Sequence, residues 1–361
     1  MAFHVKNQPN NIWHIKLKLK DGVRPDRVLE HYNFKTLGNN AYYNEVAKLY
    51  VILNTNELLL SYLSIENSSY ATETATDLFI QKNFIPKETL SKLVNAKSHL
   101  SILLLKNIFL PEDAIVKGNF DKEKIDINTT FIPNPAFNFT ESDFAFSSNN
   151  LLTLQFTQPP NAVYNLLSIS AKEKINKALN FSIDSMLLPG NKSYQLHLTN
   201  FITRADSAIS YTYDDEFNKI EKVVVNNVQE PAYTFTITGD SVNKIYNYWQ
   251  NTKIIEQTAN GNLFTSMPFV KSYCTANSNQ LAIQPQSATL PILNENFKGI
   301  LNFRFLLSKM PPNLLKYLPN TISGAISNVD EIKLSAQNSN ASVKINCTIL
   351  KKKNSLSIVK F

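Results

Sequence analysis

The chain has 361 residues, of which 43% are hydrophobic and 18% charged, and this composition predicts a folded protein long enough for two domains. The net charge of +7 would suit a nucleic-acid partner, but only four of the 36 basic residues are arginine, the residue on which base and phosphate recognition chiefly depends. We therefore exclude specific nucleic-acid binding, and we exclude a transmembrane segment because the most apolar stretch, 101–110, is half as long as the about 20 residues that a spanning helix needs.

The N-terminal part is predicted to mix short strands and helices. Residues 13–20 alternate strictly between apolar and polar types, which predicts a strand with Trp13 and Leu17 in the core and with His14 and the lysines in water. His31 is expected at the surface as well. The further predicted elements are a short helix over 24–34, a strand over 46–55, a short helix over 56–63 and a long helix over 85–105.

From about residue 110 apolar residues recur mostly at every second position, which predicts strands, and the short polar turns between them indicate antiparallel pairing. Asp240 is expected to cap a helix in which Val242, Ile245, Tyr246 and Trp249 form one stripe, so Trp249 is expected in the core. Other helices are predicted over 162–179 and after Pro312, and strands over 114–131 (two), 151–158, 194–201, 207–213, 219–225, 232–239, 279–285, 299–307 and 332–349 (two).

This order of elements predicts an α+β fold built of curved antiparallel sheets, each with helices packed on one face. Two domains are expected: an N-terminal α+β domain over 1–110 and a larger antiparallel-sheet domain with short helices over 111–361. Residues 113–131 and 330–350 predict the same type of hairpin, which suggests a duplicated unit.

Three consecutive acids, Asp214, Asp215 and Glu216, form the densest acidic group of the chain. They lie between two alternating runs, and Asp and Asn favour turns because their side chains bond nearby backbone groups, so the favoured interpretation is a hairpin turn. A calcium loop would need acids at alternating positions, a glycine at the sharp turn and a closing glutamate, none of which is present. A weak cation site and a catalytic group stay as lesser alternatives.

The remaining sequence offers little chemistry. The eight glycines lie too far apart for a phosphate-binding loop or a nucleophile elbow, and the five histidines show no metal-ligand spacing. Asp121 and Glu123 could form an acid pair on one strand face, but a solvated hairpin end is favoured. Cys274 and Cys347 are interpreted as buried structural thiols and residues 351–353 as a turn in water. No catalytic, cofactor-binding or metal-binding residue is assigned, and no cofactor is expected.

The segment "ISYTYDDEFNKIEK", the strand after it and "SVNKIYNYW" resemble a family of uncharacterised bacterial cell-envelope lipoproteins classed as domains of unknown function. The string "LFTSMPFVKSYCTANSNQLAIQP" adds to the likeness, because such proteins tend to carry a short helix, a Ser/Asn loop and a strand ahead of a closing pair of sheets. The resemblance covers residues 110–361 and carries no functional residues. The chain departs from the family in having no signal peptide or lipid-attached cysteine at its start.

We therefore expect a non-enzymatic protein that binds or scaffolds a partner in the bacterial cell envelope, the partner being an unidentified protein or envelope ligand. The envelope location, periplasmic or lipid-anchored, requires an export signal upstream of the present start; without one, the protein is expected in the cytoplasm. Two other functions stay open, a cytoplasmic structural or assembly component and a hydrolase with a dispersed site. A deep pocket with convergent polar groups would argue against the leading expectation.

Overall fold

A computed structural model of the protein describes residues 2–3, 5, 8–9, 11–20, 22, 24–80, 87–161, 165, 167–187, 190–213, 215–266, 270–285, 292–311 and 328–352. The chain divides into two compact units, Met1–Leu104 and Leu105–Phe361. Strands hold 50% of the described residues and helices 20%, so the fold is closer to all-β. The prediction of an α+β fold with helices packed on each sheet is therefore wrong.

Two predicted helices account for part of this error. Residues 56–63 form strand β6 (Glu57–Tyr62), which pairs on one side with β2 (Trp13–Lys18) and on the other with β5 (Leu49–Asn54). A central strand of this kind has a continuous apolar run, and periodicity alone cannot distinguish such a run from a helix. The helix predicted over 85–105 exists only as α3 (Lys87–Asn95), because Lys97 adopts a φ of 50° and strand β7 (Leu100–Leu104) follows.

Among the described residues of the first unit, six strands form an antiparallel sheet in the order β1-β2-β6-β5-β4-β3. Helix α2 (Ser68–Ala75) packs on this sheet, where Leu59 of β6 and Ala71 and Ala75 of the helix are buried. The other elements of this unit are β1 (Ala2–Phe3), α1 (Pro25–His31), β3 (Lys35–Gly38), β4 (Ala41–Asn44), η1 (Ile65–Asn67) and η2 (Thr76–Ile80).

Strand β2 buries the face that the sequence predicted to be in water. Trp13 is 44% exposed, whereas His14 is fully buried. Its Nε2 donates to Gln8 Oε1 at 2.6 Å, and its Nδ1 accepts from the Ser61 hydroxyl at 2.8 Å. Gln8 also donates to the Thr74 hydroxyl of α2 at 3.1 Å. A polar side chain can occupy the core when its groups are hydrogen-bonded, so strict alternation did not identify the inner face.

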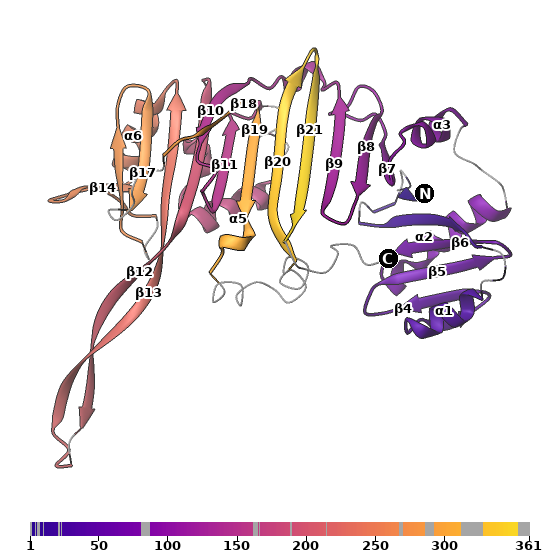
Figure 1. Ribbon diagram of the computed structural model, residues 1–361, viewed down its shortest axis with the longest axis horizontal. Helices are drawn as coiled ribbons and strands as arrows, with labels where there is room; N and C mark the ends of the chain where they lie inside the picture. The colour runs from indigo at the N-terminus through magenta and orange to yellow at the C-terminus, as the bar shows by residue number, and fades with distance from the viewer. Residues whose placement is uncertain are drawn as a thin grey trace. The chain divides into compact units, whose positions relative to one another are not determined.

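The described strands of the second unit form a long antiparallel sheet in the order β14-β15-β16-β17-β13-β12-β11-β19-β20-β21-β9-β8 (Figure 1). Strands β10 and β18 form a separate antiparallel pair. The two hairpins predicted from the sequence are confirmed as β8–β9 and β20–β21. The strands are β8 (Ala114–Phe120), β9 (Lys124–Phe131), β10 (Ser142–Phe146), β11 (Leu152–Thr157), β12 (Lys192–Tyr213), β13 (Lys219–Gly239), β14 (Ile255–Thr258), β15 (Gly261–Phe264), β16 (Ser272–Ala276), β17 (Gln280–Pro285), β18 (Glu295–Gly299), β19 (Leu301–Leu306), β20 (Val329–Ser339) and β21 (Ser342–Lys351).

The described helices of this unit are short. They are α5 (Ile169–Leu179), α6 (Val242–Asn251), η3 (Pro135–Phe137), η4 (Ile183–Ser185) and η5 (Leu307–Lys309). The helix predicted after Asp240 is confirmed as α6, but Asp240 is not its cap: Ser241 precedes the helix, and Asp240 Oδ2 accepts the N–H of Asn191 at 3.2 Å. The helix predicted after Pro312 lies outside the described residues. Of the helix predicted over 162–179, residues 162–164 and 166 also lie outside them.

Residues directly opposite in neighbouring strands point to the same face of a sheet. In the long sheet the register places apolar residues mostly opposite apolar ones and polar residues mostly opposite polar ones, so one face is apolar and the other polar. On the polar face Gln155 lies fully buried between Gln195 and Asn302 of the adjacent strands. Its Nε2 also donates to the Ala145 carbonyl of β10 at 2.9 Å, so the β10–β18 pair lies over this face. The apolar face includes Leu152, Leu154, Leu196, Phe303, Phe305, Ile332, Leu334, Cys347, Ile349, Ile125 and Ile127.

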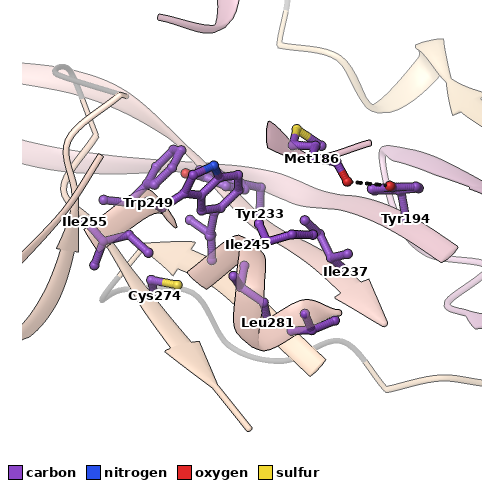
Figure 2. Close-up of a cluster of buried hydrophobic side chains, with 12 residues drawn as sticks. Met186, Tyr194, Tyr233, Ile237, Ile245, Trp249, Ile255, Cys274 and Leu281 are labelled. Carbon is purple, nitrogen blue, oxygen red and sulfur yellow. Dashed lines mark hydrogen bonds between the residues drawn. The ribbon is translucent and has the colours of Figure 1, made fainter. Parts of the chain in front are cut away.

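Helix α6 covers the end of the apolar face formed by β13, β16 and β17, and the largest core cluster lies beneath it (Figure 2). Trp249 and Ile245 of the helix are fully buried against side chains of the sheet such as Ile237 and Leu281. The prediction that the stripe of this helix faces the core is therefore confirmed. Within this cluster the Tyr194 hydroxyl donates to the Met186 carbonyl at 2.8 Å.

Candidate interaction surface

Strands β12 and β13 continue as a pair well beyond the long sheet. Strand β12 pairs with β11 over 193–198 and β13 pairs with β17 over 235–238, whereas the two pair with each other as far as Tyr213 and Lys219. Residues 200–232, which have no third strand beside them in the described part of the chain, are called the arm. Figure 1 shows the arm as a twisted two-stranded ribbon that leaves the sheet. Its first strand spans roughly 45 Å at about 3.3 Å per residue.

A β-bulge marks the base of the arm. The register of β12 and β13 shifts between Leu198 and Asn200, which leaves Thr199 as the extra residue, and Thr199 Oγ1 donates to the Ala232 carbonyl at 2.9 Å. A bulge increases the local twist and bends the strand. Pro231, next to the bulge in β13, has no N–H to offer to a further strand. Together these features let the hairpin leave the sheet.

The arm has two different faces. Opposite residues share a face, so the odd-numbered residues of both strands lie on one side and the even-numbered residues on the other. The even-numbered side, here the mixed face, combines Ser210, Thr212 and Lys222 with Ile220 and Val224. The odd-numbered side, here the apolar face, carries Ile209, Tyr211, Tyr213, Val223 and Val225 near its outer end.

These five side chains are unusually exposed for their type. Their exposed fractions are 60% for Ile209, 47% for Tyr211, 68% for Tyr213, 65% for Val223 and 62% for Val225. Together they leave on the order of 500 Å² of apolar surface in water, if a large side chain offers about 150–250 Å². This approaches the upper end of the roughly 300–600 Å² that the largest patch of a monomeric protein covers, and such patches are often functional.

The charges of the arm differ from those of the remaining chain. The arm contains six acids and three bases, a net charge of −3, so the rest of the chain carries +10 of the total of +7. The apolar face itself is balanced, since it carries Lys219 and Glu221. Lys219 Nζ lies 3.5 Å from the centre of the Tyr211 ring, a cation–π contact. On the mixed face Arg204 pairs with Glu230 at 3.2 Å.

The acidic group at 214–216 lies at the tip of the arm. Strand β12 ends at Tyr213 and β13 begins at Lys219, so the prediction of a hairpin turn is confirmed. Asp215 and Glu216 are exposed in this turn, and Asp214 lies outside the described residues. Phe217 follows with a φ of 62° and is 85% exposed, which adds an aromatic side chain to the tip.

The second acidic pair is also part of a turn. Asp121 Oδ1 accepts the backbone N–H groups of Glu123 at 2.8 Å and Lys124 at 2.7 Å, which closes the turn between β8 and β9. This confirms the predicted hairpin end. Glu123 lies 3.6 Å from Lys351 Nζ. Lys351 is the last residue of β21, so its predicted place in a turn is wrong, and Lys353 lies outside the described residues.

The histidines form no accessible site in the described part of the chain. His14 and Ser61 are in hydrogen-bonding contact, as a nucleophile and its base would be, but both are fully buried and closed to a substrate. His197, on the polar face of the long sheet, accepts from Asn150 Nδ2 at 3.1 Å, and burial lowers its pKa to about 4. His31 is exposed, as predicted. These contacts describe two buried polar networks.

The two cysteines are both free thiols. Cys274 in β16 is buried, and burial raises its pKa to about 12. Cys347 in β21 is half-buried, and its pKa is raised by burial and by the nearby Asp126 carboxylate. A raised pKa keeps a thiol protonated and unreactive at neutral pH, so neither cysteine is an activated nucleophile. The prediction of a buried structural thiol is confirmed for Cys274.

Two pockets lie among the described residues, and both are lined by uncharged side chains. A pocket of about 380 Å³ lies in the first unit, where Tyr50, Ile52 and Phe79 are among its lining residues. A second, of about 300 Å³, lies beside Phe139 and Val343 in the second unit. Within the described chain, neither lining contains an acid, a lysine, an arginine or a histidine. The arm is therefore the most distinctive candidate site.

The sequence did not reveal the apolar face of the arm as a site, because alternating apolar residues are equally typical of a half-buried strand. The sequence also predicted four separate strands over 194–201, 207–213, 219–225 and 232–239, and this is wrong, because the chain forms two continuous strands, β12 with 22 residues and β13 with 21. Most strands have about 3–10 residues, so this length distinguishes the arm once the structure is known. In the described ranges, no helix is long and apolar enough to cross a membrane, and no group of three or more potential ligands could hold a metal ion. No protein-family model, curated protein or solved structure matches the chain.

Proposed function

We propose that this is a binding or scaffolding protein that engages a macromolecular partner through the apolar face of the arm. The observation that carries the proposal is the exposure of Ile209, Tyr211, Tyr213, Val223 and Val225 on one side of a ribbon that lies outside the sheet. Aromatic side chains with a polar end, such as tyrosine, are enriched at protein interfaces. The long sheet then serves as the base that holds the arm in place.

The physical state of the arm supports this function. An isolated two-stranded hairpin is marginally stable in water, and here the apolar face has no described layer to cover it. The outer edges of both strands also carry backbone N–H and C=O groups that could pair with another strand. Natural proteins usually blunt such edges and avoid apolar patches on them, so a partner surface is the simplest use of this one.

Photo-crosslinking in the cells that make the protein tests this proposal. A photoreactive phenylalanine analogue replaces Tyr211 on the apolar face, and a matched control replaces Thr212, the next residue, on the mixed face. We expect Tyr211 to give a defined crosslinked species in at least about tenfold higher yield than Thr212, because interface positions exclude water and hold the partner close. Mass spectrometry of the crosslinked species identifies the partner.

Equal yields at the two positions, or none at either, would contradict a role of the apolar face in binding. The full-length chain is used throughout, and far-UV circular dichroism of the two purified variants checks that the substitutions leave the fold intact. This control separates a lost interface from a lost structure.

The location of the function in the bacterial cell envelope is part of the proposal and depends on the resemblance over residues 110–361. Fractionation of the native cells, followed by intact-mass analysis of the isolated protein, tests it. A processed or acylated N-terminus in the membrane fraction would support the envelope. A soluble cytoplasmic protein that begins at Met1 would contradict it and would favour a cytoplasmic assembly role for the same arm.

A further inference from the structure

We infer that the partner of the arm is a second copy of this chain, whose arm packs against the first, apolar face to apolar face. This inference rests on the proposed function, because it names the occupant of the same surface. It is carried by the area of the face, by its balance of charge and by the position of its apolar residues along the ribbon.

The area of the face is sufficient for a pair of arms. Each apolar face offers on the order of 500 Å² from its five large side chains, so two faces together bury about 1,000 Å², the lower limit of a specific interface. Other odd-numbered residues, including Thr203, Ser207 and Gln229, extend the contact on both copies. For a contact at this lower limit of area we expect a reversible dimer with a dissociation constant in the micromolar range, below about 100 μM.

The charge of the apolar face permits contact with its own copy. Lys219 and Glu221 are the charged residues of this face among those described, so the face has no net charge. The acids Asp215 and Glu216 lie in the tip, and the Arg204–Glu230 pair lies on the mixed face, away from the contact. Like-charge repulsion is therefore small at the contact, although the arm as a whole carries −3.

The order of residues along the ribbon allows a symmetric contact. Ile209 and Val223 are directly opposite, Tyr211 lies on the tip side of this pair, and Val225 lies on the base side. With Tyr213 at its tip end, the apolar cluster spans the four pairs from Ser207–Val225 to Tyr213–Lys219, so its middle lies between the Ile209–Val223 and Tyr211–Glu221 pairs. A two-fold axis through such a cluster brings the same patch of each copy together, which is the isologous contact that closes as a dimer.

Sedimentation velocity over a concentration series tests this inference on the purified full-length protein. The test variant is Ile209→Glu, in the middle of the apolar face, where Ile209 is 60% exposed. The matched control is Ile220→Glu on the mixed face of the same arm, where Ile220 is 47% exposed. Both variants add one negative charge and remove one isoleucine, and they lie on opposite faces of the outer part of the arm.

We expect the wild type to dimerise, Ile209→Glu to raise the dissociation constant at least about 10-fold, and Ile220→Glu to change it less than about 3-fold. If Ile209→Glu does not fold, the milder Val225→Ser replaces it with the same expectation. A wild type that stays monomeric up to about 100 μM, or a dimer that both isoleucine variants weaken equally, would overturn the inference.

The crosslinking experiment separates failure of this inference from failure of the proposed function. A species of twice the chain mass, containing only this sequence, supports the second copy. A different protein crosslinked specifically at Tyr211 would leave the binding function in place and overturn the second copy. Absence of any species specific to Tyr211 would contradict both.

Discussion

Replacement of Trp249 by alanine measures how much the core beneath α6 contributes to the stability of the second unit. Trp249 is fully buried, and its ring lies 5.3 Å from that of Phe181 and 5.7 Å from that of Phe264, measured between centroids. Its indole N–H donates to the Ser185 hydroxyl at 2.8 Å. Removing a buried tryptophan leaves a cavity and typically costs about 3–5 kcal/mol.

Trp249→Phe divides this cost between the ring and the hydrogen bond. Phenylalanine keeps an aromatic ring in the pocket but cannot donate to Ser185. The Ser185 hydroxyl still donates to the Ser182 carbonyl at 2.6 Å, so it is not left without a partner, and we expect a loss of about 1–2 kcal/mol. The double variant Ser185→Ala/Trp249→Phe should lose about 1 kcal/mol less stability than the sum of the losses of the two single variants, because both substitutions remove the same hydrogen bond.

Urea denaturation followed by far-UV circular dichroism gives the free energy of unfolding of each variant. Fluorescence is not a suitable probe of these variants, because they remove Trp249 and leave Trp13 in the first unit as the remaining tryptophan. A loss of less than about 1 kcal/mol for Trp249→Ala would refute the claim that Trp249 packs in the core, because removing a fully buried tryptophan with these contacts should destabilise the fold by more.

Two further predictions follow from buried titratable groups. Burial lowers the pKa of His197 from 6.5 to about 4, so between these pH values the imidazole is protonated in the unfolded chain but neutral in the folded protein. The free energy of unfolding is therefore unaffected by this group above pH 6.5 and should fall by about 3 kcal/mol as the pH falls to 4. Urea titrations at several pH values should show this fall in the wild type and a smaller fall in His197→Gln. With a thiol reagent at pH 8, Cys347 of the folded protein should react slowly, and Cys274 should react only after unfolding. Mass spectrometry of the labelled peptides measures both reactions, and rapid labelling of Cys274 in the folded protein would contradict its burial.

Local patterns were sufficient to predict the hairpins of the second unit. Alternation over 332–349 placed Leu334 and Cys347 on one face, and the two residues are register partners. The turn residues at 121–124 and 214–218 were recognisable because Asp and Asn bond to adjacent backbone, and Asp121 does so. These features depend on residues close in sequence, so a single sequence contains the necessary information.

Features that depend on distant residues could not be predicted in the same way. Burial of His14 and Gln155 requires Ser61 and Asn302, which lie 47 and 147 residues away. Whether 56–63 becomes a helix or a strand depends on β2 and β5, which supply its hydrogen-bonding partners. Alternation in the arm likewise predicts a strand with one covered face, but only the structure shows that the apolar side chains there stay exposed.

The apolar face of the arm contributes little to the stability of its own hairpin, which fits the proposed role in binding. Cross-strand pairs such as Ile209–Val223 contribute only about 0.2–1 kcal/mol each to the hairpin, and polar pairs such as Ser210–Lys222 on the mixed face hold the same register without exposing apolar surface. In a monomer, therefore, isoleucine, tyrosine and valine on the apolar face add an aggregation risk and little stability. The exposed surface becomes favourable only when it is buried, and this asymmetry between the free and bound states is what a binding surface requires.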